Sequence, residues 1–273
     1  MKKKKLGTRI WMNIVLAIWA IFELFPLIWM LILSFKSDAQ MFTTTFIFSP
    51  TLDNYTSVLF NTEYLRYFRD SLIVAGGAVL VSIVAGVPAA YAFARYNFKK
   101  KEDIAFQILS FKFAPEVLVV LPLFMIYQKL GLYDSYFGLI WVYQLISMPL
   151  IIWVVRGYFE DISVEIEYAA EVDGYGWFQI FWKNLIPLIR PGLVSAALLA
   201  FIFAWNDFTF PLMLAGTNIQ PVTVAVTKYL GTDTTHYGQL AVAAALSALP
   251  SIIFALCIQK HLVRGLSFGA VKG

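Results

Sequence analysis

The strongest constraint on this chain is a series of six apolar stretches, each about 20 residues long or longer, enough for a helix to cross the hydrocarbon core of a bilayer. A chain of 273 residues that is 60% hydrophobic and 14% charged cannot bury so much apolar surface in one water-soluble core. The sequence therefore predicts an all-α integral membrane protein with one transmembrane domain, residues 10–260, between tails 1–9 and 261–273. The expected spans are residues 10–35, 70–94, 105–127, 137–156, 188–212 and 240–260.

The distribution of lysine and arginine predicts the orientation, because basic residues accumulate in the short cytoplasmic loops of membrane proteins. One side collects 15 of the 21 basic residues, from the two tails and from the connections that follow the second and fourth spans. Both termini are therefore expected in the cytoplasm, which agrees with an even number of spans. The loop 157–187, between the fourth and fifth spans, is then cytoplasmic as well.

This loop is a polar segment in an otherwise apolar chain, and its residues predict two short helices. Ser163 can cap a helix whose first turns carry Glu165 and Glu167, since carboxylates are favoured at the positive end of a helix. Gly174 tolerates the positive φ that ends such a helix, and a second helix is expected from about residue 177 until Pro187 interrupts it. The pair would form a knob suited to docking with another protein. The alternative is an interfacial hairpin whose aromatic side chains rest among lipid headgroups.

The order of residues in the loop is more specific than its composition. The segment Glu167-Tyr168-Ala169-Ala170 is followed by Gly174, and Pro187 comes thirteen residues after that glycine. This pattern resembles the EAA loop of the permease subunits of ABC sugar importers of the maltose-transporter type. The resemblance covers nearly the whole chain, and its other supporting stretches are residues 89–95, 122–124, 130–132, 205–208 and 263–273.

The resemblance implies a role for the loop and a set of partners. In that family the EAA loop forms coupling helices that sit in a cleft of a cytoplasmic ATPase subunit. Tyr168 departs from the family pattern, because a second glutamate often stands there, and this bears on which ATPase fits. The residues implied for the ATPase contact are Glu167, Tyr168, Ala169, Ala170, Asp173, Gly174, Tyr175 and Gly176.

The same resemblance implies a bacterial inner-membrane protein that works with a second homologous permease, two ATPase copies and an extracytoplasmic solute-binding protein. The solute would be a sugar or a related polyhydroxylated compound. The chain has no GxxxxGK[ST] phosphate loop, so it is expected to be non-catalytic and to hold no metal or cofactor, with ATP and Mg²⁺ bound by the ATPase. Nucleic acid is not an expected partner, since the basic residues cluster at the ends of apolar segments.

Polar and ionisable side chains within the spans are candidates for the solute pathway, because a central charge costs about 2.5–3.5 kcal/mol on insertion scales and usually faces a partner or a cavity. Aromatic side chains nearby could stack on a sugar. The alternative is structural: Lys112 and Glu116 pair on one helix face, Glu23 bonds backbone freed near Pro26, and the tryptophans pack. The candidates are Glu23, Lys112, Glu116, Trp141, Tyr143, Trp205, Asn206 and Asp207.

Other functions remain open at this point. Glycerol-phosphate, amino-acid or peptide import through the same architecture is the nearest alternative, although a phosphate ligand should require several cationic groups in the pathway. Proton-coupled secondary transport could use Glu23, Lys112 and Glu116 as a relay. An intramembrane enzyme is disfavoured, because neither HExxH nor GxSxG occurs in the sequence.

Overall fold

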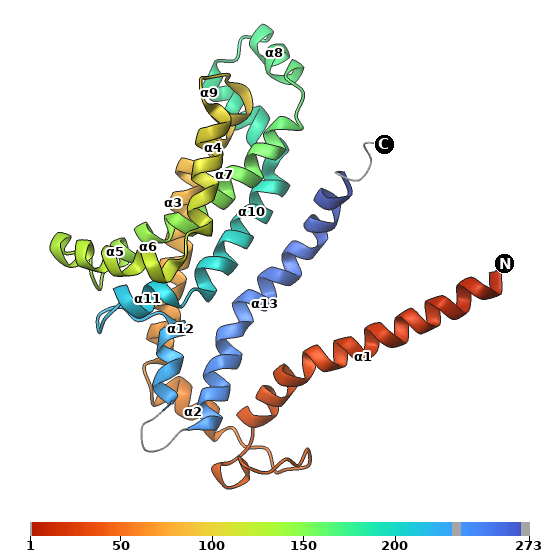
Figure 1. Ribbon diagram of the computed structural model, residues 1–273, viewed down its shortest axis with the longest axis vertical. Coiled ribbons are helices and arrows are strands. Elements are labelled where there is room, and N and C mark those ends of the chain that lie inside the picture. Colours follow the sequence, from red (N-terminus) through yellow and green to blue (C-terminus); the bar gives the residue numbers. More distant parts are fainter. Residues whose placement is uncertain (1, 231–235, 269–273) are drawn as a thin grey trace. The chain divides into compact units, whose positions relative to one another are not determined.

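The structure is a computed structural model that describes the backbone of residues 2–230 and 236–268 and, within those ranges, the side chains of residues 9–259. The described part of the chain is helical and contains no β-strand (Figure 1). The longer helices are α1 (Lys2–Ser34), α3 (Tyr64–Arg95), α5 (Glu116–Leu130), α7 (Gln144–Glu160), α10 (Ile186–Asn206) and α13 (Tyr237–Phe268). The shorter ones are α2 (Asp53–Phe60), α4 (Lys101–Ser110), α6 (Tyr136–Val142), α8 (Glu165–Val172), α9 (Trp177–Gln179), α11 (Thr209–Leu214) and α12 (Val222–Ala225). Short 3₁₀ turns occupy Asp38–Gln40, Phe111–Phe113 and Val226–Tyr229, and a π-helical segment occupies Ile180–Leu185.

Four continuous helices are long and apolar enough to cross a membrane, namely Arg9–Ser34, Tyr64–Arg95, Trp177–Asn206 and Tyr237–Gln259. Two further crossings are possible as bent pairs. Lys101–Phe113 joins Glu116–Leu130 at 92°, and Tyr136–Val142 joins Gln144–Glu160 at 45°. The described residues therefore hold four spans, or up to six if each bent pair counts as one, and the prediction of an all-helical membrane protein is confirmed.

The predicted third span, residues 105–127, is broken in the middle. Ala114 is extended, with ψ at 131°, and Pro115 follows it. Proline lacks the N–H that would continue the helix, and its ring pushes the preceding residue out of the helical region. Lys112 and Glu116 consequently belong to two different helices, so they do not share the helix face on which the sequence suggested that they pair.

The helix at the predicted fifth span, residues 188–212, both begins and ends earlier in the chain than the sequence predicted. Its helical run begins earlier, at Trp177, and passes through the π-helical segment just before Pro187. Because Pro187 has no N–H to donate, a widened turn here accommodates the proline, where the sequence predicted an end to the helix. The run stops at Asn206, Asp207 is extended, and α11 begins at Thr209.

The chain forms two compact units. The first contains Met1–Leu65 and Val226–Ala248, and the second contains Arg66–Ala225 with the segment from Leu249 onward. In the first unit the buried amide of Asn54 donates to the carbonyls of Ser34 and Lys36, at 3.2 and 2.8 Å, and so fixes the end of α1. Of the predicted tail 261–273, the helix α13 includes residues up to Phe268, and residues 269–273 lie outside the described part.

The second unit is built around α3, α4, α7 and α10. Ile151, Val155 and Phe159 of α7 are fully buried. Gly192 of α10 faces the ring of Tyr158, and a Cβ at this position would lie 2.3 Å from that ring. Only glycine allows this approach, and small residues commonly permit close helix packing in membranes. In Figure 1, α8 lies beyond the ends of the helices α3, α7 and α10.

Candidate functional site

The loop between α7 and α10 folds as two short helical segments joined at Gly174. Ser163 Oγ accepts from the Glu165 N–H at 3.4 Å as α8 begins. At the other end Gly174 has a φ of +87°, with its N–H bonded to Glu171 O at 3.0 Å. The Tyr175 N–H donates to Ala170 O at 3.0 Å, so that α8 ends in a C-cap with a glycine in the left-handed conformation. The two short helical segments are therefore present in the structure, although the second continues past Pro187 into α10.

The residues of the predicted ATPase contact divide into two groups. Glu167 and Ala170, three residues apart, face inward and are buried. The others are exposed, with Tyr168 at 61%, and on the same outer face Val172, which is not one of the predicted residues, is 88% exposed. The exposed members of the predicted set are Tyr168, Ala169, Asp173, Gly174, Tyr175 and Gly176.

Glu167 is bound to the end of α3. The side chains of Arg95 and Glu167 are each 10% exposed, and Arg95 Nε donates to Glu167 Oε1. Tyr91 Oη donates to Glu167 Oε2 at 2.7 Å, while Arg95 Nη2 donates to Ile162 O at 2.8 Å. Removing one member of a buried ion pair typically costs about 3–5 kcal/mol, because the remaining charge is left without a partner. These contacts hold α8 firmly against α3.

An aromatic cluster surrounds this ion pair. Phe181 lies in the π-helical segment before α10. The centre of its ring is 5.4 Å from that of Tyr91, 5.6 Å from that of Trp177 and 6.2 Å from that of Phe159. Each such pair contributes about 0.5–1.5 kcal/mol beyond the burial of area. The cluster therefore joins the ends of α3 and α7 to the second half of the loop, and Tyr91 also bonds to Glu167 in the first half.

The sequence did not identify Tyr91 and Arg95 as site residues. They appeared only within a stretch that supported the family resemblance. Their spacing, four residues apart at the end of an apolar span, places both side chains on one helix face. Together with an acidic loop expected on the same side of the membrane, that spacing was a signal that could have identified them.

A second candidate site is a polar cavity between the break that separates α4 from α5 and the end of α10. It has a volume of about 620 Å³, and its ionisable lining residues are Lys112, Glu116 and Asp207, with Asn206 and Thr209 beside them. Lys112 Nζ lies 4.0 Å from the centre of the Phe203 ring. Lys112 and Glu116, which both lie in the described part of the chain, do not form an ion pair, since their ammonium nitrogen and carboxylate oxygens are not within 4.0 Å. The cavity thus offers one ammonium group, two carboxyl groups, an amide and a hydroxyl.

Two of the cavity residues also have structural contacts. Asp207 is 9% exposed, and its Oδ2 accepts from the Phe210 N–H at 3.2 Å, at the start of α11. The amide of Asn206 donates to Ile202 O at 2.8 Å and to Ser251 Oγ at 2.9 Å, which connects α10 to α13. Their side chains are therefore held in place where the helix ends.

The remaining predicted pathway residues lie elsewhere. Trp141 lines a separate apolar cavity of about 470 Å³ and stacks on Phe137. Trp205 is 2% exposed and packs on Phe201 and Phe68. Tyr143 does not line the polar cavity, but it is fully buried beside the ring of Phe210 and contacts the side chain of Asp207. Glu23 is exposed on α1, in the first compact unit.

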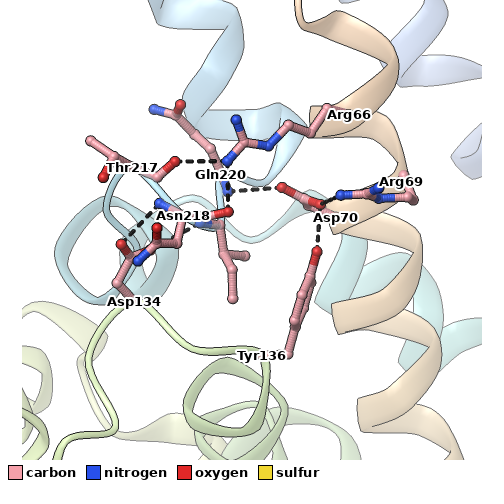
Figure 2. A network of polar contacts seen from close by, with 9 residues as sticks. Arg66, Arg69, Asp70, Asp134, Tyr136, Thr217, Asn218 and Gln220 are labelled. Carbon is pink, nitrogen blue, oxygen red and sulfur yellow. Dashed lines mark hydrogen bonds and ion pairs between the residues drawn. The ribbon is translucent and has the colours of Figure 1, made fainter.

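A third cluster of polar contacts holds the segment that follows α11 (Figure 2). The carboxylate of Asp134 accepts from the backbone N–H groups of Gly216, Asn218 and Ile219, at 2.8–2.9 Å. Arg66, at the start of α3, donates to the carbonyls of residues 217 and 218, at 2.8 Å each. Residues 216–220 are therefore fixed to α3 on one side and to the turn before α6 on the other.

Asp70, one turn further along α3, completes this cluster. It is fully buried and accepts from Tyr136 Oη at 2.6 Å, from Arg69 at 3.2 Å and from the Gln220 N–H at 3.2 Å (Figure 2). A buried carboxylate needs such donors, because its charge has lost the stabilisation of water. Within the described residues, no three histidine, cysteine or acidic side chains are grouped in a way that could hold a metal ion.

Comparisons with known proteins agree with the resemblance. Residues 78–268 match the model of the family described as "Binding-protein-dependent transport system inner membrane component". The chain is 34% identical to the trehalose transport system permease protein SugB of Mycobacterium tuberculosis, over 92% of this chain and 93% of that protein. It is 32% identical to the trehalose/maltose transport system permease protein MalG of Thermococcus litoralis, over 93% of each.

Among solved structures, a chain of a bacterial ABC transporter involved in the import of the acidic polysaccharide alginate aligns with a TM-score of 0.76. It is 26% identical to this chain, and the alignment covers 91% of this chain and 94% of that one. A chain of the MetNI methionine ABC transporter aligns with a TM-score of 0.59 at 17% identity, over 74% of this chain and 95% of that one, and supports the fold alone.

Proposed function

Because the chain belongs to the family of binding-protein-dependent transport system inner membrane components, we propose that it is the transmembrane permease subunit of an ATP-driven importer for a sugar or a related polyhydroxylated solute. Its curated relatives include permeases named for trehalose and for maltose. The six crossings, with both termini in the cytoplasm, follow from the apolar stretches and from the distribution of basic residues.

The observation that carries this proposal is the geometry of the loop 157–187. It is a well-bonded helical knob, fastened by buried contacts to α3, with Tyr168, Ala169 and Val172 exposed on its outer face. A short helix with an exposed apolar face suits a groove in another protein. In this proposal the groove belongs to an ATPase subunit that binds ATP and Mg²⁺, and closure of the ATPase pair moves the knob.

The polar cavity is proposed as part of the solute pathway. Asn206, Thr209, Glu116 and Lys112 provide both donors and acceptors, as the hydroxyl groups of a sugar require. The ring of Phe203 lies beside them and offers an apolar face for the C–H side of a sugar ring. A second, homologous permease would supply the opposite wall, and an extracytoplasmic binding protein would deliver the solute.

Reconstitution tests the transport reaction. The chain would be placed in liposomes with its partner permease and ATPase, and uptake of labelled trehalose or maltose from its binding protein would be measured with and without ATP. The proposal expects accumulation that requires ATP and survives collapse of the proton gradient. Uptake that persists without ATP and disappears with the proton gradient would instead establish proton-coupled transport.

A charge placed on the docking face tests the role of the knob. Ala169 is exposed, so Ala169→Asp should leave the fold intact while it introduces a desolvated carboxylate into the ATPase contact. Capture of the ATPase and ATP-dependent uptake should both fall at least about tenfold, as for a loss of roughly 1.4 kcal/mol. Thr56→Asp, on the exposed face of α2, is the matched control and should change neither. Normal capture of the ATPase by the Ala169→Asp variant would show that the knob is not part of the ATPase contact.

A further inference from the structure

We propose that α3 is the strut that carries the motion of the docking knob to the polar cavity, with Glu167 and Asp70 as the positioning residues at its two ends. This inference rests on the proposed function, since it takes the knob as the part that an ATPase moves. It assigns Glu167 to a contact within this chain, and it leaves the ATPase contact to the exposed face of α8.

The inner end of α3 is bound to the knob through one face. Tyr91 and Arg95 are four residues apart, and both bond to the carboxylate of Glu167. Arg95 also donates to Ile162 O, at the connection between α7 and α8. Since Glu167 is 8% exposed, a partner protein seated on α8 would meet Tyr168 and Val172 rather than this carboxylate. Any displacement of α8 therefore pulls or pushes on the end of α3.

The outer end of α3 is bound to the segment that leaves the cavity. Asp70 accepts from the Gln220 N–H, and Arg66 donates to the carbonyls of residues 217 and 218 (Figure 2). At the next residue, Ser71 Oγ accepts from the Val222 N–H at 2.7 Å. This segment continues directly from α11, whose first residue, Thr209, lines the cavity with Asp207. Four hydrogen bonds thus join α3 to the segment that follows α11, and α11 begins at the rim of the proposed pathway.

The helix between these ends is suited to transmit a displacement. Asp70 and Arg95 are 25 positions apart on one helix, about 38 Å at the usual rise of 1.5 Å per residue, enough to cross the bilayer. Gly77 and Gly86 face side chains of α6 and α7 so closely that a Cβ would lie 2.6 Å from Ile140 and 3.2 Å from Ile151. These close contacts, together with the hydrogen bond from Ser82 Oγ to Gln144 Oε1 at 2.6 Å, pack the middle of α3 against α6 and α7, so that α3 can act as one rigid element.

The test compares variants that remove one charge each. Glu167→Gln breaks the ion pair at the inner end, and Asp103→Asn removes an exposed carboxylate from α4, outside the knob, as the control. Glu167→Gln should capture the ATPase as the wild type does, while the solute imported per ATP hydrolysed falls ~5-fold or more, the usual lower limit for coupling between two sites. Tyr91→Phe removes only one hydrogen bond and should give a smaller loss in the same direction.

The outer end is tested by Asp70→Asn, alone and with Glu167→Gln. If α3 is one strut, breaking both ends should reduce import per ATP no further than breaking the more sensitive end, because variants in one chain of contacts are not additive. If the loss of import per ATP in the double variant equals the product of the two single losses, the two ends act independently, and the proposal that α3 is one strut is wrong. Amounts of each variant in the membrane are measured in parallel, and Tyr91→Phe decides the inner end if Glu167→Gln fails to assemble.

Other outcomes separate this inference from the proposed function. If Glu167→Gln loses ATPase capture while Tyr91→Phe keeps both capture and import per ATP, Glu167 is a direct ATPase contact and the inference is wrong. If Glu167→Gln and Asp103→Asn import equally well per ATP hydrolysed, the ion pair has no part in coupling. A wild-type chain that shows no ATP-dependent uptake would instead contradict the proposed function itself.

Discussion

The docking knob and the polar cavity use polar groups in opposite ways. At the knob, Glu167 has its carboxylate oxygens bonded to Arg95 and Tyr91, and aromatic rings pack around them. At the cavity, Lys112 and Glu116 stand on separate helices and line an open space of about 620 Å³. A part that transmits movement must be internally bonded, whereas a part that binds a passing solute must keep polar groups available. The two regions of one chain differ in this respect.

The same substitution should therefore have different consequences in the two regions. Phe181→Ala removes a ring that is 2% exposed from the centre of the aromatic cluster, and it should lower the free energy of unfolding by about 3–5 kcal/mol. Phe203→Ala removes a ring that is 45% exposed at the cavity, where the main loss is the cation–π contact with Lys112, about 0.5–1 kcal/mol. Thermal unfolding in detergent measures both. Equal losses would mean that the cluster is no more important to the fold than the cavity wall.

A change of charge at the cavity should affect transport and leave assembly intact. Lys112→Met keeps most of the side-chain volume and removes a donor for solute hydroxyls, so uptake at low solute concentration should fall about tenfold, as for a lost charge-assisted hydrogen bond of roughly 1.5 kcal/mol. ATPase capture should not change. Lys129→Met, on the exposed last turn of α5, is the control. Full uptake by Lys112→Met would place the solute pathway elsewhere.

A smaller effect distinguishes the turn of the knob from an ordinary helix position. Gly174 has a φ of +87°, so Gly174→Ala should lower the free energy of unfolding by about 1–2 kcal/mol through backbone strain. Gly157 lies within α7 with no atom near the position of an added Cβ, so Gly157→Ala should raise it by up to about 1 kcal/mol. Chemical denaturation of the purified variants measures the change in the free energy of unfolding for each substitution. A loss of stability in both variants would show that strain at Gly174 is not the cause.

The sequence predicted the helical membrane architecture because crossing a bilayer requires long apolar helices, and that requirement is visible residue by residue. It also located the knob, since Gly174 and the acidic first turn of α8 act locally. The break at Ala114–Pro115 was foreseeable in principle from the proline. Its 92° bend depends on how α4 and α5 pack against other helices, which no local pattern reveals.

Side-chain partners that are distant in sequence were beyond prediction from one chain. Glu167 could equally have faced an ATPase, and only the packing of α8 on α3 places it against Arg95, 72 positions away. Trp205 was a candidate because its ring could stack on a sugar, yet it is 2% exposed and packed in the interior, while the adjacent Asn206 lines the cavity. Lys112 and Asn206 share a cavity through tertiary packing alone.

The most direct test of this account is to map what the knob touches in the assembled transporter. In a Cys257→Ser background, a photoactivatable maleimide would be attached to Tyr168→Cys on the knob or to Asn218→Cys on the segment after α11, and cross-linked products would be identified by mass spectrometry. Tyr168→Cys should cross-link to the ATPase, and Asn218→Cys should not. Cross-linking of the ATPase to Asn218→Cys, or its absence from Tyr168→Cys in an assembly that hydrolyses ATP, would contradict this account.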